Sequence, residues 1–430
     1  MHRIVIAGGG AGGLELATRL GDTLGKSGKA SITLIDRSRT HLWKPLLHEV
    51  AAGSMNIHAH QLDYLAQARW HHFSFALGAL DGLNRTAHEV KVAAVREEDG
   101  IDVLPPRRIA YDSLVIAIGS QCNDFGTPGV KEHAFTLDSA WEANLFHRRL
   151  VNACFRANYA ADGRVLNINI VGAGATGVEL AAELHNTTRV LTAYGLDQFD
   201  CETQIRIHII EAGPRILAGL PDYIADATLE TLRALNVAVL CNERVVAIEN
   251  DKVLTASGKS LPADFTIWAA GIKCADILRD LDGLESNRLN QLVVQATLQT
   301  ARDENVFALG DCAACNWTEG RAVPPRAQSA HQQASHLVKT IKRRINGKPP
   351  TDFHYRDFGS LVSLGNYQSV GTLMGFVSKG SVRVEGIVAK LFYISLYKLH
   401  LWSLHGFWRM ALDTLARMIK RQTEPRVKLH

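Results

Sequence analysis

Long apolar runs and the dense cysteine pattern of a secreted scaffold are both missing from this chain of 430 residues. Its uncharged runs stay below the ~18 apolar residues that a helix needs to span a bilayer, so no membrane-spanning helix is expected. A β-branched stretch, Arg3 to Ala7, follows the N-terminus directly and leaves no space for a signal peptide. The seven cysteines are scattered rather than arranged as a secreted disulfide framework. The bulk of the protein is therefore expected to be soluble and to work in a reducing cytoplasm.

A strong overall charge is also absent, since the formal net charge is +4. The charge is unevenly distributed, because the segment from Gly386 onward has eight Lys or Arg residues and two acidic residues. That segment therefore carries +6 and the remainder −2, so the basic character belongs to the C-terminal tail. The length suggests about three domains, and a hydrophobic content of 47% is enough for substantial cores.

Glycine is present in two similar clusters. The first cluster follows the strand-like stretch Arg3 to Ala7 and precedes a helix-periodic stretch of leucine and alanine. Gly8, Gly10 and Gly13 stand where a strand must turn sharply into a helix and let a pyrophosphate approach the backbone. Amides at the start of that helix can hold the phosphates. Asp36 ends the next strand-like stretch, at about the distance that suits a carboxylate bound to ribose hydroxyls.

A second cluster repeats this plan farther along the chain. Gly172, Gly174 and Gly177 follow the β-branched stretch Leu166 to Val171, and Glu211 ends the next strand-like stretch. One such motif alone would be weak evidence, because glycine-rich turns also serve tight packing. Two copies, each with strand, helix, strand and acidic residue in order, predict two bound dinucleotides.

The two halves share further features, which indicate an internal repeat at the scale of domains. An apolar stretch closes each half, ending at Gly119 in the first and at Gly271 in the second. A third stretch, Asn305 to Asp311, resembles a late strand that returns to the first half. The predicted fold class is α/β, with two Rossmann-like dinucleotide-binding domains and a C-terminal membrane-associating region. The predicted domains are 1–121 together with 290–348, an inserted domain at 122–289, and a C-terminal region at 349–430.

The C-terminal region begins at Pro349 and Pro350 with a few strand-like stretches, and helical periodicity follows. Between Ile387 and Ile419, apolar residues favour one face, and a turn is expected at His405 and Gly406. The apolar residues are Leu391, Phe392, Ile394, Leu401, Trp402, Leu404, Phe407, Trp408, Leu412 and Leu415. This pattern fits a helix lying among lipid headgroups. It fits equally a helical hairpin docked on the core or forming a contact between two copies.

These features resemble the flavoprotein reductases that have two dinucleotide-binding domains. Gly310 and Asp311 look like the motif that holds the ribityl or phosphate region of the flavin in that group. The stretch Ala327 to Gln333 is similar to the AQxAxQ motif of the type II, non-proton-pumping NADH:quinone oxidoreductases. Three more stretches, 41–50, 268–272 and 393–400, resemble the bacterial members. The resemblance covers nearly the whole chain.

The resemblance implies a respiratory flavoenzyme with a non-covalent FAD in the first unit and NADH as substrate in the second. It also implies a pocket beside the flavin for a membrane quinone, ubiquinone or menaquinone, and electron transfer without proton pumping. The C-terminal helices would hold the protein on the lipid surface of the inner membrane, peripherally and on its cytoplasmic side. A homodimer stays open, and no metal site is expected. Further cofactor contacts are expected at Lys44, Gly119, Asp311, Ala327, Ala270 and Gly271.

Three polar residues are candidates for the chemistry. Gln328 and Gln332 are one helical turn apart, so one face can present two amides to a quinone carbonyl; ordinary surface glutamines are the alternative. A helix starting near Ala327 would point its positive end at the pyrimidine edge of the flavin, where negative charge gathers on reduction. Glu179 follows the second glycine cluster and is expected to orient the nicotinamide amide or to help deliver a proton to the quinone. Its alternative role is a favourable charge near a helix N-terminus.

Nucleotide preference depends on Glu211, because a carboxylate at the ribose edge repels the 2′-phosphate of NADPH. Two features weaken this preference for NADH. An apparent insertion lies around 193–202, and Arg215 is close enough in sequence to be a phosphate partner. Cys312 and Cys315 have the spacing of a redox pair, but they do not open a thioredoxin-type helix, so their role stays open.

Other classes fit the sequence less well. Disulfide reductases of this fold place their cysteines just after the first dinucleotide unit, and the stretch Arg39 to Gly53 has none. Sulfide:quinone oxidoreductases need cysteines beside the flavin and no complete second nucleotide site, so the intact motif at Gly172 points away from them. A flavin-binding redox sensor, with its basic tail on nucleic acid, is a further alternative. Tail aromatics interleaved with leucine fit a lipid interface better, so no nucleic-acid partner is expected.

Overall fold

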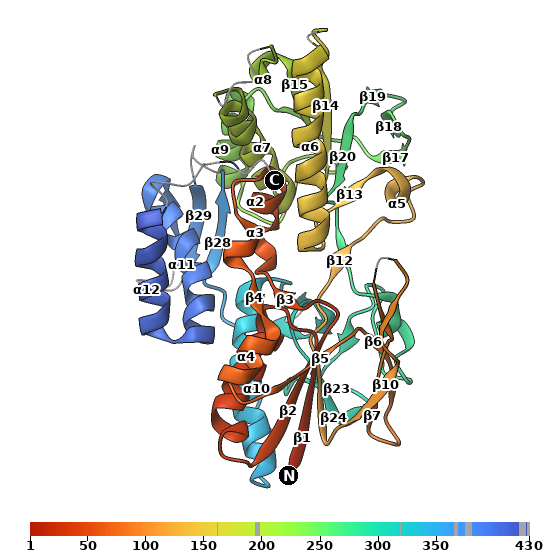
Figure 1. Cartoon of the computed structure of the whole chain (residues 1–430), viewed down its shortest axis with the longest axis vertical. Helices are drawn as coiled ribbons and strands as arrows, with labels where there is room; N and C mark the ends of the chain where they lie inside the picture. Colours follow the sequence, from red (N-terminus) through yellow and green to blue (C-terminus); the bar gives the residue numbers. More distant parts are fainter. Residues whose placement is uncertain are drawn as a thin grey trace.

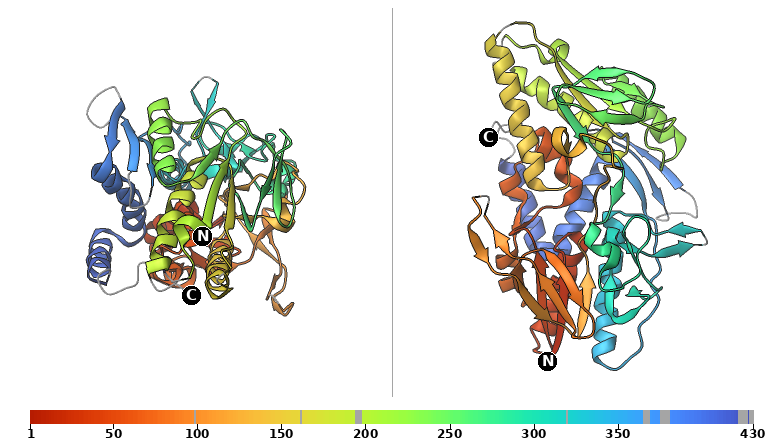
Figure 2. Two further views of the ribbon diagram at one scale, coloured as in Figure 1. Left: turned by 90° about the horizontal axis from the view of Figure 1, so that it is seen from above. Right: turned by 90° about the vertical axis from the view of Figure 1, so that its right-hand side faces the viewer.

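The computed structural model describes residues 1–97, 99–160, 162–193, 198–318, 320–364, 369–374, 381–420 and 427. The molecule is elongated, with two α/β units stacked along its long axis (Figure 1). The C-terminal region, in blue, lies on one side of their junction in both Figure 1 and Figure 2. None of the helices in the described residues is long and apolar enough to cross a membrane. The predicted α/β class with two Rossmann-like units is confirmed.

The first unit is built on a six-stranded sheet with the order β23-β24-β11-β1-β2-β5. Its strands are β1 (His2–Ala7), β2 (Ala30–Asp36), β5 (Ser74–Leu77), β11 (Ser113–Ile116), β23 (Gln299–Thr300) and β24 (Asp303–Ala308). All pairings except that of β23 with β24 are parallel. Helices α1 (Ala11–Leu20) and α10 (Ala327–Ile345) pack against each other and share one core with the sheet. The central strands are buried and apolar from Ile4 in β1 and from Leu114 in β11 onward.

The second unit repeats this plan with a parallel sheet of order β13-β20-β14-β15-β16. Its strands are β13 (Phe135–Thr136), β14 (Leu166–Val171), β15 (Ile205–Ile210), β16 (Ala238–Leu240) and β20 (Phe265–Trp268). Helices α6 (Ala140–Ala160), α7 (Ala175–Ala193) and α9 (Asp222–Ala234) contribute the buried side chains that complete its core.

Each unit also has a small antiparallel sheet, visible on the right-hand side of Figure 1. The first contains β6 (Leu80–Asn84), β7 (Glu89–Val92) and β10 (Arg107–Ala110). The second contains β17 (Val245–Ile248), β18 (Lys252–Thr255) and β19 (Ser260–Pro262). These sheets occupy corresponding places in the two units, which supports the internal repeat.

The chain crosses between the units twice. It leaves through β12 (Gln121–Cys122) and returns through β21 (Ile272–Lys273), and these two strands pair with each other in antiparallel register. After the return, β24 pairs with β11 in the register Leu114 to Val306. The late strand expected from 305–311 therefore does extend the first sheet.

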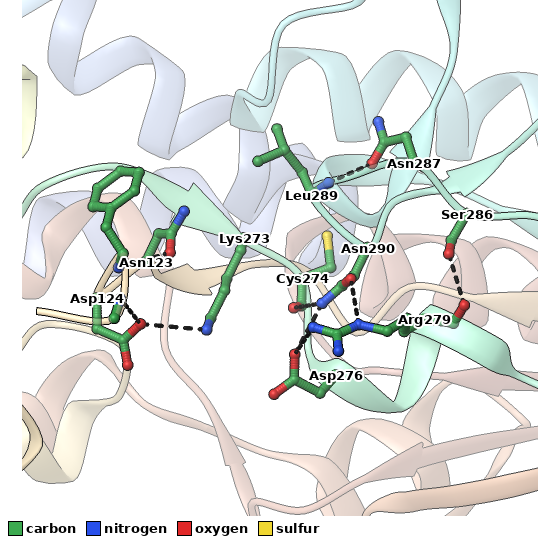
Figure 3. A network of polar contacts seen from close by, with 12 residues as sticks. Asn123, Asp124, Lys273, Cys274, Asp276, Arg279, Ser286, Asn287, Leu289 and Asn290 are labelled. Atoms are coloured by element: carbon green, nitrogen blue, oxygen red, sulfur yellow. Dashed lines mark hydrogen bonds and ion pairs between the residues drawn. The ribbon is translucent and has the colours of Figure 1, made fainter.

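Polar contacts hold the second crossing in place (Figure 3). Lys273 Nζ lies 3.5 Å from Asp124 Oδ1, which joins the two crossing segments. Just beyond, the buried Asn290 donates to the carbonyl of Cys274 at 3.2 Å and to Asp276 Oδ1 at 3.0 Å. These contacts link the two crossing segments to each other and to the first unit.

The C-terminal region contains a three-stranded antiparallel sheet and two helices. They are β28 (Gly359–Ser363), β29 (Ser369–Met374), β30 (Ser381–Glu385), α11 (Gly386–His405) and α12 (Phe407–Lys420). The turn expected at His405 and Gly406 is confirmed, and Gly406 has φ +77°. On α11, Leu401 and Leu404 are buried, whereas Leu399 and Trp402 are exposed on the other side.

This arrangement combines two alternatives that the sequence left open. Helix α11 docks on the protein, since Leu404 joins the core of the first unit. Helix α12 exposes an apolar stripe, Trp408, Leu412, Leu415 and Ile419, whose members are 56–77% exposed. A docked helix and an outward-facing apolar surface are therefore both present in the tail.

Candidate active site

The first glycine cluster forms the turn from β1 to α1, and its geometry explains which positions must be glycine. Gly8 has φ +110°, and a methyl group there would collide with the carbonyl of Ala117. A methyl group at Gly13 would collide with the carbonyl of Gly8. A methyl group at Gly10 would meet no atom within 4 Å, so the backbone is bare where a pyrophosphate would approach.

The second cluster, between β14 and α7, has the same backbone geometry. Gly172 has φ +104°, and a methyl group there would lie 2.8 Å from the backbone of Ala270. A methyl group at Gly177 would collide with the carbonyl of Gly172, and one at Gly174 would meet nothing within 4 Å. Both motifs therefore form loops with an open side, as the sequence predicts.

An acidic residue supports each loop from the neighbouring strand. Asp36, at the end of β2, accepts the N–H of Gly9 at 2.6 Å. Glu211, just after β15, accepts the N–H of Ala173 at 2.7 Å. Each carboxylate also accepts the backbone N–H two residues farther along, at 2.7 Å. Burial raises the pKa of Asp36, which these backbone hydrogen bonds counteract. The two acids thus occupy equivalent places beside the two open loops.

The closing strands end in turns that face the glycine loops. Gly119 and Gly271 have φ +73° and +61°, values that favour glycine. Ser120 donates its hydroxyl to Asp311 Oδ2 at 2.6 Å, which brings the Gly119 turn next to Asp311. Ala270 lies directly beneath Gly172. The structure therefore brings the closing turn of each half next to predicted cofactor residues, at the carboxyl ends of the strands.

Lys44 joins the two units at the same edge. It begins the 3₁₀ turn Lys44–Leu46, and its Nζ donates to the carbonyl of Ser120 at 2.8 Å. The same Nζ pairs with Asp138 Oδ1 of the second unit at 3.1 Å. The ammonium group of Lys44 therefore lies between the Gly119 turn and the second unit.

Helix α10 begins at Ala327, as expected, and its first N–H groups precede the first intrahelical hydrogen bonds. Sequence analysis missed Gln333, whose buried Oε1 accepts the N–H of Gly310 at 2.6 Å. Its helical spacing with the buried Ala330 and Ala334 would have placed it on the inner face. Gln333 therefore ties the helix to the Gly310–Asp311 turn.

Gln328 and Gln332 both contact the segment that leads into β28. Gln328 Nε2 donates to Asp357 Oδ1 at 3.2 Å and to the carbonyl of Gly359 at 3.1 Å. Gln332 donates to the carbonyl of Arg356 at 2.8 Å and accepts its N–H at 3.0 Å. The two amides are on one face, as predicted, but their hydrogen bonds go to the protein backbone and Asp357.

Glu179 lies where α7, β28 and the short helix α2 (Leu47–Ala52) meet. Its Oε1 accepts the N–H of Ser363 at 3.0 Å, and its Oε2 lies 3.7 Å from His48 Nδ1. Burial raises the pKa of Glu179 to about 8, with Glu49 and Glu183 adding to the rise. Burial lowers the pKa of His48 to about 4. At neutral pH, Glu179 therefore keeps its proton and His48 is uncharged, so the two do not form an ion pair.

Arg215 has partners close to it in the chain. Its Nη2 donates to the carbonyls of Ala218 and Leu220 at 3.0 and 2.9 Å, and its Nη1 lies 3.3 Å from Asp222. These contacts hold the guanidinium against the segment that follows β15. Residues 194–197 of the apparent insertion lie outside the described part of the chain.

Six of the seven cysteines have described side chains, and all six are free thiols. They are Cys122, Cys154, Cys241, Cys274, Cys312 and Cys315. Burial raises the pKa of Cys312 and of Cys315 to about 11, and that of Cys122 to about 12. These three are therefore protonated at neutral pH and are poor nucleophiles.

Two more residues that the sequence analysis missed contact the first loop. The carbonyl of Gly9 accepts the hydroxyl of Tyr64 at 2.7 Å and Nδ1–H of His41 at 2.9 Å. Both side chains are buried. No local motif marks them, because each meets the loop only through the tertiary fold.

Comparisons with known proteins agree with this geometry. Residues 2–334 match the pyridine nucleotide-disulphide oxidoreductase family. The type II NADH:quinone oxidoreductase of Haemophilus influenzae is 42% identical over the full length of both chains. The protein of the same name from Staphylococcus aureus is 30% identical over 87% of this chain and 90% of its own length.

Solved structures show the same fold. NDH2 from Plasmodium falciparum, solved in complex with NADH, aligns with a TM-score of 0.81 at 20% identity over 99% of both chains. The sulfide:quinone oxidoreductase from Aquifex aeolicus aligns with a TM-score of 0.73 at 19% identity, over 94% of this chain and 91% of its own. From the sequence relatives, the chain belongs to the pyridine nucleotide-disulphide oxidoreductase family and, within it, to the type II NADH:quinone oxidoreductases.

Proposed function

We propose that this protein moves hydride from NADH to a bound FAD and then passes two electrons to a membrane quinone, without pumping protons. The observation that carries the proposal is the pair of glycine loops with the same geometry, each supported by an acidic residue. The name of the Haemophilus influenzae relative states the same overall reaction. FAD, when bound, takes up the hydride and releases the electrons, so the protein has to bind, align and exclude water.

The first loop fits the pyrophosphate of FAD. The bare side at Gly10 leaves room for the phosphates, and Asp36 is at the place of the ribose hydroxyls. Asp311, Gly119 and Lys44 lie together farther along the same edge, where the rest of the cofactor would extend.

The second loop fits NADH in the same way. Gly174 leaves the phosphate side open, and Glu211 is at the ribose edge. Gly271 and Ala270 form the opposite wall of the loop. Arg215 is committed to two carbonyls and Asp222, so a 2′-phosphate would meet Glu211 without a positive partner.

The positive end of α10 supports the electron-transfer step. Ala327 starts the helix, and Gln333 fixes the Gly310–Asp311 turn beside it. The N–H groups of the first turn stabilise negative charge at a group placed against them. Gln328 and Gln332 would then serve the quinone carbonyl only after exchanging their present hydrogen bonds.

Glu179 is suited to supply a proton to the quinone. Its pKa of about 8 means that it holds a proton at neutral pH, inside the protein and between the two units. Hydride transfer and quinone reoxidation should be measured separately in Glu179→Gln. Slower quinone reoxidation with unchanged hydride transfer supports proton delivery. Two unchanged rates would contradict that role.

Membrane attachment is proposed through α11 and α12. The exposed stripe of α12 and the outer side of α11 give an apolar surface, and basic residues accompany it. Deleting residues 406–430 should release the protein from anionic vesicles in a sedimentation assay. A second copy of the chain is the alternative occupant, and it would appear as a dimer without lipid. We also propose that this attachment is to the cytoplasmic face of the inner membrane.

The domain limits are proposed as 1–121 with 290–348 for FAD, 122–289 for NADH and 349–430 for the tail. The first crossing, β12, lies at the first boundary. The second crossing, β21, lies inside the proposed second domain, and Cys274 and Leu278 just after it already join the core of the first unit. The tail contacts both units, since α11 meets α1 and β28 meets α7.

The function is tested by an anaerobic titration of the purified full-length protein. One equivalent of NADH should bleach the flavin absorbance rapidly, and a short-chain quinone should restore it. Bleaching without recovery would point to another electron acceptor, and no bleaching would overturn the nucleotide assignment. Sulfide in place of NADH serves as the control, and flavin reduction by sulfide alone would favour a sulfide:quinone oxidoreductase.

A further inference from the structure

The carbonyl of Gly9 has unusual support for a nucleotide-binding loop. It accepts hydrogen bonds from two buried side chains, Tyr64 at 2.7 Å and His41 at 2.9 Å. This carbonyl belongs to the same peptide unit as the N–H of Gly10. Because the peptide is planar and trans, fixing the carbonyl points that N–H in the opposite direction. The bare side of the loop at Gly10 is the side on which a pyrophosphate would be bound.

His41 connects this peptide to the C-terminal tail. Its Nε2 lies 3.0 Å from Nε2 of His400, which is on α11. A carbonyl only accepts, so Nδ1 of His41 must carry the proton and Nε2 must be the acceptor. His400 therefore donates its Nε2–H to His41, and His41 donates its Nδ1–H to Gly9.

Both imidazoles are neutral, which keeps this chain of donors intact. Burial lowers the pKa of His41 to about 4, and burial together with His41 holds the pKa of His400 well below its usual value. A proton on Nε2 of His41 would put two donors face to face and break the contact.

The tail helix is seated firmly at this point. The ring of Trp43 stacks on His400, with centroids 6.0 Å apart and planes at 19°, and it also meets Tyr397 at 5.4 Å. One turn after His400, Leu404 is buried in the core of the first unit. His400 is thus held by packing as well as by its hydrogen bond.

We propose that His41 and His400 are positioning residues for the pyrophosphate of FAD, and that the seating of α11 and the retention of FAD are coupled through them. This inference rests on the proposed FAD site in the first unit. The coupling is reciprocal, because two events that favour the same arrangement must favour each other equally. A tail helix that is out of place leaves His41 without its donor and the Gly9 peptide less well fixed.

FAD dissociation from the full-length protein tests the positioning role, with the rise in flavin fluorescence as the signal. His400→Phe keeps the aromatic stacking and removes the donor, so FAD should bind about ten-fold more weakly, as for an acceptor left unpaired in the interior. His400→Gln returns an amide N–H near the place of Nε2 and should stay within about two-fold of the parent. His405→Phe, on the same helix and without contact to His41, is the matched control. Equal FAD affinity in His400→Phe and the parent would overturn the proposal, and so would a Gln variant as weak as the Phe variant.

Hydrogen exchange tests the coupling without any turnover. Adding FAD to the apoprotein should slow amide exchange in 397–404 of the parent and of His405→Phe. His41→Asn keeps a donor near Gly9 and loses the link to His400, so FAD should bind but should no longer protect α11. Undiminished protection in His41→Asn would contradict the coupling. The same variant supplies a test if His400→Phe does not fold. Failure of the parent to bind FAD would instead overturn the proposed cofactor site.

Discussion

The two glycine loops have the same backbone and different surroundings. In the first loop, the carbonyl of Gly9 accepts two side chains, and a methyl group at Gly9 would collide with the hydroxyl of Tyr64. In the second, the equivalent residue is Ala173, whose carbonyl accepts only the backbone N–H of Leu217 among the hydrogen bonds described, at 2.8 Å. The carbonyl of the first loop is held by two side chains, and that of the second loop by one backbone N–H.

The clearest difference in exposure is at Gly12, which is buried, and its equivalent Thr176, which is exposed. The middle glycines do not differ in this way, since Gly10 and Gly174 are both exposed. A methyl group at Gly12 would lie 2.6 Å from the side chain of Leu309. An enclosed loop suits a cofactor that stays bound, and an open loop suits a substrate that exchanges in every turnover. The difference between the loops therefore fits FAD in the first and NADH in the second.

The largest effect is expected when each loop is blocked in turn by a side chain. Gly8→Ala places a side chain at φ +110° against the carbonyl of Ala117, and Gly172→Ala places one at φ +104° against Ala270. Each substitution costs about 1–3 kcal/mol in backbone strain, before the collision is counted. Gly8→Ala should be purified largely without FAD. Gly172→Ala should keep its yellow colour and need at least about ten-fold more NADH for half-maximal flavin reduction. Absorbance of the purified proteins and anaerobic titration measure both effects, and loss of FAD in both variants would contradict the division of roles.

The next largest effect is expected on the pH dependence of stability, at Glu179. Burial raises its pKa from the ordinary 4.5 to about 8, so the unfolded chain ionises this carboxyl before the folded protein does. Its contribution to stability is therefore complete below about pH 4.5 and is lost as the pH rises towards 8. Over that window the parent should lose up to about 5 kcal/mol relative to Glu179→Gln, from ~1.4 kcal/mol for each pKa unit.

Denaturant unfolding of both proteins between pH 4 and 9 measures this difference. The gap between their free energies of unfolding should change with pH up to about 8 and then level off. Glu183→Asp is the matched control, since it changes a neighbouring buried side chain and keeps its carboxyl group. A gap that stays constant with pH would mean that Glu179 is ionised in the folded protein.

Some features of the two loops could be predicted from the sequence, and others could not. The glycine loops, Asp36 and Glu211 were predictable, because a strand, a turn and a helix close in sequence determine their geometry. The contact between His41 and His400 joins residues 359 positions apart, so only the tertiary fold brings it about. The pKa of Glu179 likewise depends on β28, which arrives from the tail and covers it with Ser363.

Side-chain direction was the second limit. Gln328 and Gln332 were predicted on one helix face, which is correct, but helical spacing does not tell which partners that face meets. Arg215 is close to Glu211 in sequence, and spacing alone did not predict its hydrogen bonds to the carbonyls of Ala218 and Leu220. Spacing determines the face of an element, and the packing of other segments determines the partners.

A smaller effect is expected at the ribose edge of the second loop. Glu211→Gln should lower kcat/KM for NADH by about ten-fold, since charge-assisted hydrogen bonds are about twice as strong as neutral ones. NADPH should remain the poorer substrate, because Arg215 stays bound to two carbonyls and Asp222. Steady-state rates with both nucleotides measure the ratio, and Asp36→Asn in the first loop is the matched control for FAD. A variant that prefers NADPH would show that Arg215 is free to turn.

The smallest effect is expected at the residue that distinguishes the loops. Ala173→Gly gives the second loop a glycine where the first loop has Gly9. Among the described hydrogen bonds, the carbonyl of residue 173 keeps the backbone N–H of Leu217 as its partner. The free energy of unfolding should fall by about 0.5–1 kcal/mol, the usual cost of glycine for alanine. The dissociation constant for NADH should change by less than about two-fold, because the N–H to Glu211 remains. The reverse change, Gly9→Ala, should displace Tyr64 and lower FAD affinity about ten-fold, as for a lost buried hydrogen bond. Comparable losses in the two variants would mean that the loops differ in sequence but not in the way their cofactors are held.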